Sequence, residues 1–454
     1  MNKNKKINKL IIILCGIELV LILFFLAYLL VSSFLIGGDS LIVSPVLYIS
    51  ILLICLVPIG MFGYYLSIRN RKTNTFKFEK EDNDLTKSGK PINKKEKSER
   101  FSELKELDRV LKDKTVQFDE VTSLKDFATA FRNYCAYKKG LYYTEKDIRS
   151  FISNLATSKT MVLQGMSGTG KTSIALAFED FIGNQTTVIA VQPMWKERSD
   201  LVGYFNEFTK KFNETPLLKE LYRSNFDNQI YIIVLDEVNI ARVEYYFAEF
   251  LSLLEYPNED QRTLEITNDT WPKDPMKLEE GRLKIGNNVY FVGTANNDES
   301  TFTISDKVYD RAMIINLDKK ASKFVGEEQG RVRISNQNFE NLANMAVNEY
   351  QENEKVDKWI NDINVLLKEY FAINFGNRMV NQIKKYIPVY VSTGGKDIEA
   401  FDDFVSKKIL RKLDGKDALK INSAIEPFLE ELKATFGNEN MVECIRYVEK
   451  FKIN

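Results

Sequence analysis

The 454-residue chain carries 63 Lys and Arg against 63 Asp and Glu, and it contains no histidine. The balanced charge gives no global basic field that would favour DNA or anionic lipid, although a local basic patch is compatible with it. Without histidine, the sequence excludes Ser-His-Asp catalysis, His-metal sites and HNH-type nuclease chemistry. Its four cysteines are single and scattered, so neither a zinc cluster nor a disulfide framework is indicated.

Two long apolar runs open the chain. Between Leu10 and Ile36 the only charged side chain is Glu18, and residues 41–68 contain none. Each run exceeds the roughly 20 residues that a helix needs to cross a bilayer core. A cleaved signal peptide explains the first run less well, because its apolar part is too long. Residues 1–72 are therefore expected to form a membrane anchor with two transmembrane helices.

The charges that flank these runs predict their orientation. Lysines precede the first run, Arg69, Arg71 and Lys72 follow the second, and the loop between them carries only Asp39. Positive charge favours the cytoplasmic side, so we expect a cell-membrane protein with both termini in the cytoplasm. Glu18 is either a contact between helices or copies, or a protonated or snorkelling acid near the inner leaflet. The second interpretation is favoured.

Residues 73–119 are expected to be a charged linker with a short helix. Residues 73–100 are mostly polar and charged, with little to bury, as in a solvated tether. The apolar side chains that then recur at helical spacing are Phe101, Leu104, Leu107 and Leu111. This spacing predicts an amphipathic helix that docks on the folded body.

A phosphate-binding loop follows an apolar strand. After "MVLQ" comes "GMSGTGKTS" and then a helical "IALAFEDFI", which together fit G-x-x-x-x-G-K-[ST] in its required context. Backbone amides and the helix N-terminus would bind phosphates, Lys171 would reach the outer ones, and Thr172 would ligate Mg²⁺. A chance glycine loop is disfavoured by the strand and helix around it. The nucleotide-binding residues expected in this loop are Gly165, Met166, Ser167, Gly168, Thr169, Gly170, Lys171, Thr172 and Ser173.

Two further apolar stretches end in polar side chains. "IYIIVLDEVN" predicts a buried strand that ends in Asp236 and Glu237. Asp236 would hold Mg²⁺ directly or through water, and Glu237 would activate the attacking water; the alternative is an acidic helix N-terminus. After "VYFVG", Asn296 would contact the lytic water or the outer phosphate if its strand lies beside the other two. Taken alone, "GTANNDES" would be a polar turn.

These residues resemble the AAA+ ATPases, and more narrowly the McrB branch, over roughly residues 120–318. The likeness lies in "LYYTEKDIRSFISNLATSKTMVLQGMSGTGKT", "VQPMWKERSDLVGYFNEFTKKFNETPLL", "LDEVNIARVEYYFAEFLSLLE" and "GTANNDESTFTISDKVYDRA". The resemblance implies an α/β fold: a P-loop AAA+ core, with a parallel sheet flanked by helices, over residues 120–325. A C-terminal helical lid would occupy residues 326–454.

The resemblance also assigns roles. It makes Asn296 the polar sensor and Asp298 or Glu299 its acidic companion, although the family commonly reads N-T-A-D where this chain reads N-N-D-E. Arg311 matches the arginine finger that a neighbouring subunit inserts; the alternative is a surface arginine. Arg378 in "FGNR" resembles the second sensor at the nucleotide, or it caps or braces a helix.

A last stretch, "DLVGYFNEFTKKF", places aromatic rings close to Lys210 and Lys211. By resemblance it borders the central pore, where its rings could grip a polymer, but core packing is the preferred interpretation for any single ring. These aromatic residues are Tyr204, Phe205, Phe208 and Phe212.

Together the features predict a membrane-anchored AAA+ nucleoside triphosphatase of McrB type. It would use Mg²⁺ and ATP, with GTP possible, and act as a homo-oligomeric ring on an unidentified protein or nucleic-acid substrate. A DNA translocase of a restriction-type defence system, with a separate nuclease or effector subunit, is one alternative. A nucleotide-gated membrane scaffold is the other, and the intact catalytic residues argue against it.

Overall fold

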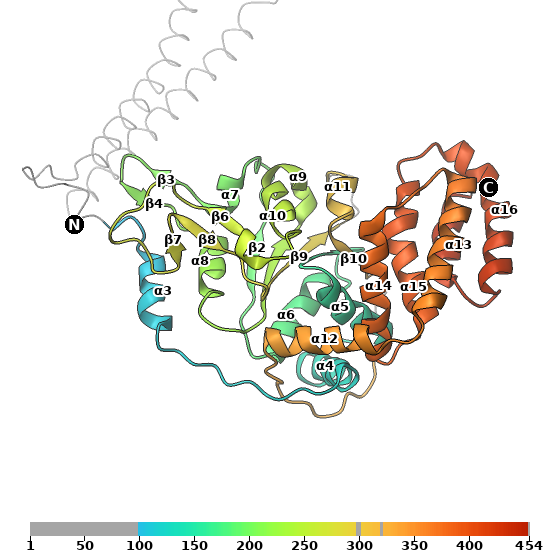
Figure 1. The fold of residues 1–454 in the computed structure, drawn as a ribbon, viewed down its shortest axis with the longest axis horizontal. Helices are drawn as coiled ribbons and strands as arrows, with labels where there is room; N and C mark the ends of the chain where they lie inside the picture. The colour runs from blue at the N-terminus through green and yellow to red at the C-terminus, as the bar shows by residue number, and fades with distance from the viewer. Residues whose placement is uncertain (1–98, 297–300, 318–320, 453–454) are drawn as a thin grey trace, which may run out of the picture. The chain divides into compact units, whose positions relative to one another are not determined.

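The computed structural model describes residues 99–296, 301–317 and 321–452 (Figure 1). All of them belong to one compact unit, Asn93–Asn454. The two predicted transmembrane spans with Glu18, the tether as far as residue 98, and the acidic pair Asp298 and Glu299 lie outside the described residues. Within the described stretches, none of the helices combines the length and apolar character that crossing a membrane requires.

A five-stranded parallel sheet forms the centre of the α/β core, in the order β10-β1-β9-β5-β2. Its strands are β1 (Thr160–Gln164), β2 (Thr187–Ala190), β5 (Tyr231–Asp236), β9 (Val289–Ala295) and β10 (Met313–Asn316). Every residue of β9 is buried, as are the first five of β5, which explains their unbroken apolar sequences. The predicted α/β core with a parallel sheet is confirmed.

Helices cover both faces of this sheet (Figure 1). One apolar cluster includes side chains of α4 (Leu124–Lys139), α5 (Glu145–Thr157), α6 (Lys171–Phe181) and α12 (Asn336–Glu349). The other includes side chains of α7 (Arg198–Val202), α8 (Pro216–Arg223), α9 (Val243–Tyr246), α10 (Ala248–Leu253) and α11 (Asp306–Tyr309). Short 3-10 helices at Val238–Ile240 and Glu259–Gln261 complete this half.

Two small antiparallel sheets accompany the core. One is the hairpin of β3 (Phe205–Asn206) and β4 (Lys211–Phe212), and the other orders β6 (Thr263–Glu265), β8 (Arg282–Lys284) and β7 (Leu278–Glu279) as β6-β8-β7. For the aromatic residues of this hairpin, the sequence left open whether they line a pore or pack in the core. The structure gives different answers for different rings. Phe212 is buried and stacks on Phe101 at 5.0 Å between ring centroids, whereas Phe208 at the tip is 99% exposed.

The end of the predicted tether is fixed to the folded body, so the prediction that residues 73–100 are solvated is wrong at Arg100. The guanidinium of Arg100 is buried, donates hydrogen bonds to Asp269 and Asp274, and lies 4.7 Å from the ring of Trp271. The amphipathic helix expected next is α3 (Glu103–Leu111), which packs on α8. Arg100 and α3 are therefore part of the folded body.

The C-terminal helical region has an apolar core of its own. Its helices are α13 (Asn353–Phe371), α14 (Asn377–Ser392), α15 (Asp397–Phe404), α16 (Ala418–Phe436) and α17 (Val442–Glu449), with a π-helical turn at Val405–Ile409 and a 3-10 turn at Leu410–Leu413. The expected boundary at residues 325 and 326 falls in the extended stretch before α12. Although α12 lies in the sequence assigned to the lid, its buried side chains join the α/β core.

A buried lysine joins the helical region to the α/β core. Nζ of Lys408 donates to the carbonyl oxygens of Tyr309 and Ala312 at 2.7 and 2.6 Å, on either side of Arg311. Burial lowers the pKa of Lys408 to about 7. Its neighbour Asp403 accepts hydrogen bonds from Ser150 of α5 at 2.7 Å and from Tyr386 at 2.8 Å. The helical region thus holds the backbone that carries Arg311.

We expect Lys408→Met to lower the free energy of unfolding by about 1–3 kcal/mol, because two buried carbonyls lose their donor. Urea denaturation of the purified chain would measure this loss. Lys412→Met is the control, since Lys412 is more exposed and its Nζ lies 3.8 Å from Asp310. Equal losses in the two variants would contradict the role given to Lys408.

Candidate nucleotide-binding site

The strand order brings the sequence-predicted site residues to one edge of the sheet. β9 pairs with β1 on one side and with β5 on the other, and all three run parallel. Their carboxyl ends therefore lie together. Gly165 follows β1, Asp236 ends β5 and Asn296 follows β9. The interpretation of Asn296 required that its strand lie beside the other two, and this is the case.

The glycines of the phosphate loop have conformations that other residues rarely adopt. Gly165, Gly168 and Gly170 have φ values of 141°, 76° and 94°. A Cβ on Gly165 would lie 2.4 Å from the carbonyl oxygen of Leu317, which follows β10. Gly170 caps α6, and its carbonyl oxygen accepts a hydrogen bond from the hydroxyl of Tyr143 at 3.0 Å. The loop is therefore shaped by close backbone packing.

Lys171 is buried and its ammonium lies inside the loop. Its Nζ donates to the carbonyl oxygens of Gly165 and Met166 at 2.9 and 2.8 Å. The remaining loop residues, Ser167, Thr169 and Ser173, lie at the start of α6 or just before it. A bound phosphate would offer this ammonium an anionic partner in the same place.

An oxygen-rich pair suited to Mg²⁺ lies beside the loop. The hydroxyl of Thr172 donates to Oδ1 of Asp236 at 3.0 Å, and the hydroxyl of Thr294 donates to the same oxygen at 2.7 Å. Hydroxyl and carboxylate oxygens are ligands that Mg²⁺ prefers, with the remainder coming from phosphate and water. Thr172 and Asp236 therefore fit the metal role that the sequence predicted for them.

Glu237 and Asn296 face each other at this edge. Nδ2 of Asn296 donates to Oε1 of Glu237 at 3.3 Å. The backbone of Glu237 is left-handed, with φ of 56°, and its amide donates to the hydroxyl of Thr294 at 3.0 Å. Such a conformation costs about 1–3 kcal/mol in a residue other than glycine. It leaves the carboxylate of Glu237 exposed beside the amide of Asn296.

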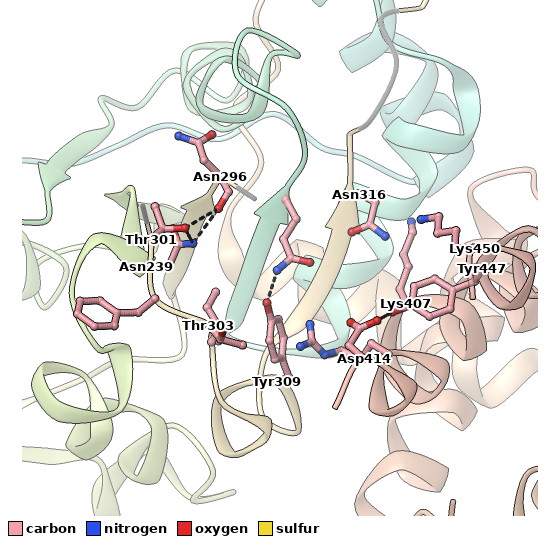
Figure 2. Close-up of a pocket in the computed structure, with 14 residues that line it drawn as sticks. Asn239, Asn296, Thr301, Thr303, Tyr309, Asn316, Lys407, Asp414, Tyr447 and Lys450 are labelled. Atoms are coloured by element: carbon pink, nitrogen blue, oxygen red, sulfur yellow. Dashed lines mark hydrogen bonds between the residues drawn. The ribbon is translucent and has the colours of Figure 1, made fainter. Parts of the chain in front are cut away.

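Sequence reasoning missed the residues that hold Asn296 in place. Nδ2 of Asn239 donates to the carbonyl oxygen of Asn296 at 2.8 Å and to the hydroxyl of Thr301 at 2.9 Å (Figure 2). Asn239 lies in "LDEVNIAR", only three residues after Asp236. Its proximity to the acidic pair was the available signal.

A polar hollow of about 340 Å³ adjoins Asn296 (Figure 2). The strand-end side chains Gln164 and Asn316 meet residues of the helical region there, including Lys407, Arg411 and Lys450. The guanidinium of Arg411 lies 3.0 Å from the ring centroid of Tyr309. The helical region thus contributes charged side chains to the hollow that adjoins the predicted sensor, which the sequence did not reveal.

Arg311 and Arg378 lie at the opposite edge of the sheet. Met313 of β10 pairs with Met161 of β1, so Arg311 lies near the level of residue 159, before β1 begins. The phosphate loop starts about six residues later, which at the rise of a strand is roughly 20 Å away. Nε of Arg311 lies 3.4 Å from Glu255, and a terminal nitrogen of Arg378 lies 2.8 Å from the same carboxylate. The structure brings these two arginines together and keeps both away from the chain's own loop.

Comparison with protein families gives two matches. Residues 160–312 match the AAA domain (dynein-related subfamily), and residues 328–453 match a domain of unknown function, DUF8727. The chain is also 24% identical over 229 residues to the type IV methyl-directed restriction enzyme EcoKMcrB subunit of Escherichia coli (strain K12). That alignment spans 44% of this chain and 44% of the relative.

Similar solved structures include a Cytophaga hutchinsonii protein described as a "putative ATPase". It is 16% identical, covers 72% of this chain and 96% of its own, and has a TM-score of 0.43. A full-length MCM homologue from Methanopyrus kandleri is 11% identical, covers 68% and 62% respectively, and has a TM-score of 0.36. Residues 160–312 are therefore similar to AAA domains of the dynein-related subfamily, and the chain spans less than half the length of the restriction-enzyme subunit that it matches.

Proposed function

We propose that this protein is a membrane-anchored, McrB-like AAA nucleoside triphosphatase that couples hydrolysis of ATP, or of GTP, to remodelling or movement of a substrate. The observation that carries the proposal is the meeting of Lys171, Thr172, Asp236, Glu237 and Asn296 at one edge of the sheet. These residues supply the phosphate contact, the metal ligands, the base and the polar sensor that phosphoryl transfer to water needs.

In the proposed mechanism the loop amides and Lys171 bind the outer phosphates. Thr172 and Asp236 hold Mg²⁺, which would neutralise charge on the phosphates. Glu237 takes a proton from the attacking water, and Asn296 orients that water or contacts the outer phosphate. Thr294 fixes this arrangement, because its hydroxyl contacts both Asp236 and the amide of Glu237.

The proposal includes a homo-oligomeric ring, and the position of Arg311 supports it. The side chain of an arginine is far shorter than the roughly 20 Å between Arg311 and its own phosphate loop. If Arg311 acts as a finger, the nucleotide that it contacts would be held by another copy. The exposed Phe208, beside Lys210 and Lys211 at the hairpin tip, is our candidate contact for a protein or nucleic-acid polymer.

A DNA translocase subunit of a restriction-type system is the second candidate. It is favoured by the 24% identity to the EcoKMcrB subunit, and it would need a separate nuclease or effector partner. A nucleotide-gated scaffold without turnover would not require Glu237, Asn296 and Asn239 to be held in a connected arrangement.

Nucleotide binding and nucleotide hydrolysis can be separated by substituting single residues. We expect Lys171→Ala to abolish nucleotide binding, because it removes the buried phosphate contact. Glu237→Gln should still bind but lose turnover by about a hundredfold or more. Equilibrium binding and phosphate release would measure the two effects, and parental turnover in Glu237→Gln would disprove its catalytic role.

Mixing two inactive variants tests the ring. Arg311→Ala and Glu237→Gln should each bind nucleotide, and loss of the finger should slow hydrolysis on the order of a thousandfold. Mixed rings would contain sites that pair an intact Glu237 with a neighbour's intact Arg311, so mixing should restore phosphate release. If subunits exchange and every mixture stays inactive, Arg311 is not supplied by a neighbour.

Membrane topology is tested by labelling cysteines in intact cells. A cysteine introduced beside Asp39 should react with a membrane-impermeant reagent, and one beside Ser98 should react only after permeabilisation. Both proposed spans and the cytoplasmic body require this pattern. Reaction beside Ser98 in intact cells would place the body on the other side of the membrane.

A further inference from the structure

The polar hollow of about 340 Å³ beside Asn296 lies on the face of the sheet that α11 covers (Figure 2). Side chains alternate along β1, so that Val162 joins the apolar cluster on the α11 side and Leu163 joins the one on the α6 side. Gln164 therefore points to the α11 side, and its amide donates a hydrogen bond to the hydroxyl of Tyr309 in α11. The hollow and the helix that begins at the phosphate loop thus lie on opposite faces of the sheet.

Asn296 separates this hollow from the candidate nucleotide-binding site. Residues 165–173, Asp236 and Glu237 do not belong to its lining. The side-chain amide of Asn296 is directed to Glu237, whereas its carbonyl oxygen accepts a hydrogen bond from Asn239, which lines the hollow. A ligand in the hollow would therefore occupy a different space from a nucleotide at the phosphate loop.

The hollow carries an excess of one positive charge. Of its lining residues, Lys407, Arg411 and Lys450 are cationic and Asp414 is acidic. Nζ of Lys407 lies 2.7 Å from Asp403, a buried acid outside the lining. This pair leaves Arg411 and Lys450 against Asp414. By charge complementarity, the hollow favours a ligand with an anionic group.

Three donors that line the hollow are not fully used by the chain itself. The guanidinium of Arg411 lies on the ring of Tyr309, and its Nε is buried without a hydrogen-bond partner. Within the described ranges, the ammonium of Lys450 forms no ion pair or hydrogen bond, and the side-chain amide of Asn316 forms no hydrogen bond. These residues belong to the 3-10 turn at Leu410–Leu413, the end of α17 and the end of β10. The fold therefore brings donors from three separate elements to one space.

An acceptor in the lining is also left over. Both hydrogens of the Asn239 amide are engaged, one by the carbonyl oxygen of Asn296 and one by the hydroxyl of Thr301, but Oδ1 of Asn239 is buried without a partner. Asn239 is only 5% exposed, and such orphaned polar atoms are rare in folded proteins. A hydroxyl or amino group of a ligand would give this oxygen a partner after a small rotation of the side chain.

We propose that the hollow is a binding site for a sugar phosphate, either free or as part of a nucleotide, that is separate from the phosphate loop. Arg411, Lys450 and Asn316 donate to the phosphate oxygens, because guanidinium and ammonium groups form strong, charge-assisted hydrogen bonds with phosphate. Sugar hydroxyls donate to Asn239 and to Asp414, an acid that would repel a bare phosphate ion. The volume of about 340 Å³ falls within the range of small-molecule sites and leaves room for the sugar beside the phosphate.

Occupation of the hollow acts on hydrolysis through Asn239, a step that rests on the proposed function. Nδ2 of Asn239 holds the carbonyl oxygen of Asn296, so a ligand bound to Oδ1 fixes Asn239 and with it the backbone of the polar sensor. Asn239 is thus a positioning residue. Binding of the sugar phosphate itself requires no hydrolysis, so the two can be tested apart.

The test is calorimetric titration of ribose 5-phosphate into the purified full chain carrying Lys171→Ala, which removes the phosphate-loop contact. Saturable binding should remain. Adding Arg411→Gln or Lys450→Gln should weaken it about tenfold, as expected for loss of one charged contact. Lys450 is exposed and Arg411 packs on Tyr309, so Lys450→Gln tests the site even if Arg411→Gln disturbs folding.

Lys452→Gln is the matched control, because Lys452 pairs with Glu426 at 2.6 Å and does not line the hollow. It should bind like the chain with Lys171→Ala alone. Inorganic phosphate should bind more weakly than ribose 5-phosphate, because it lacks the hydroxyls for Asn239 and Asp414. Absence of saturable binding, equal weakening by Lys450→Gln and Lys452→Gln, or equal affinity for inorganic phosphate would each overturn the proposal.

Two further measurements assign the source of the ligand and its effect. In the Lys171→Ala chain, displacement of ribose 5-phosphate by adenosine or guanosine monophosphate would identify a nucleotide as the ligand, and failure to displace it would identify a free sugar phosphate. Both results retain the site. In the chain with an intact loop, the bound ligand should raise phosphate release severalfold, and Lys450→Gln should remove this stimulation. Binding without stimulation would overturn the role of Asn239, whereas a chain that never hydrolyses nucleotide would contradict only the proposed function.

Discussion

The position of β9 between β1 and β5 is the constraint on which the rest of the structure depends. Without that order, the phosphate loop, the acidic pair and Asn296 would end at separate places along the sheet. The order is stabilised by burial: β9 is enclosed on both faces, and Gly293 within it leaves room for Val238, whose side chain would lie 2.9 Å from an added Cβ. Packing in the middle of the sheet thus positions the polar atoms at its edge.

The opposite edge of the sheet depends on the C-terminal helical region. Lys408 binds the carbonyls on either side of Arg311, while Arg378 of α14 shares the carboxylate of Glu255 with Arg311. The same region contributes Lys407 and Arg411 to the hollow that adjoins Asn296. It therefore contacts both this hollow and the surface that, in the proposed ring, would face a neighbour's nucleotide. A shift of this region would change both surfaces together.

The sequence was sufficient for the parallel α/β core and for the position of the glycine loop between β1 and α6, because each of these features is local. A glycine loop between strand and helix, and acids at a strand end, are readable without knowing the fold. Arg378 illustrates the opposite case. Its helix is visible from spacing, but the edge of the sheet that it approaches depends on how α14 packs against α5 and α15. Glu255, Lys408 and Arg411 were missed for the same reason, since their partners are distant in sequence.

The functional charges already have partners within the single chain. Lys171 donates to loop carbonyls, Asp236 accepts from two threonines, and Glu255 holds the two arginines. In the proposed function, nucleotide binding would replace the contacts of Lys171 and Asp236, and ring assembly would replace those of Glu255. Only the difference between old and new interactions contributes to affinity. A neighbour that presents bound phosphates gives Arg311 a more highly charged partner than Glu255, whereas an empty neighbour gives it none. Ring closure is therefore expected to depend on nucleotide through the contacts at Glu255, without any further signal between the two edges of the sheet.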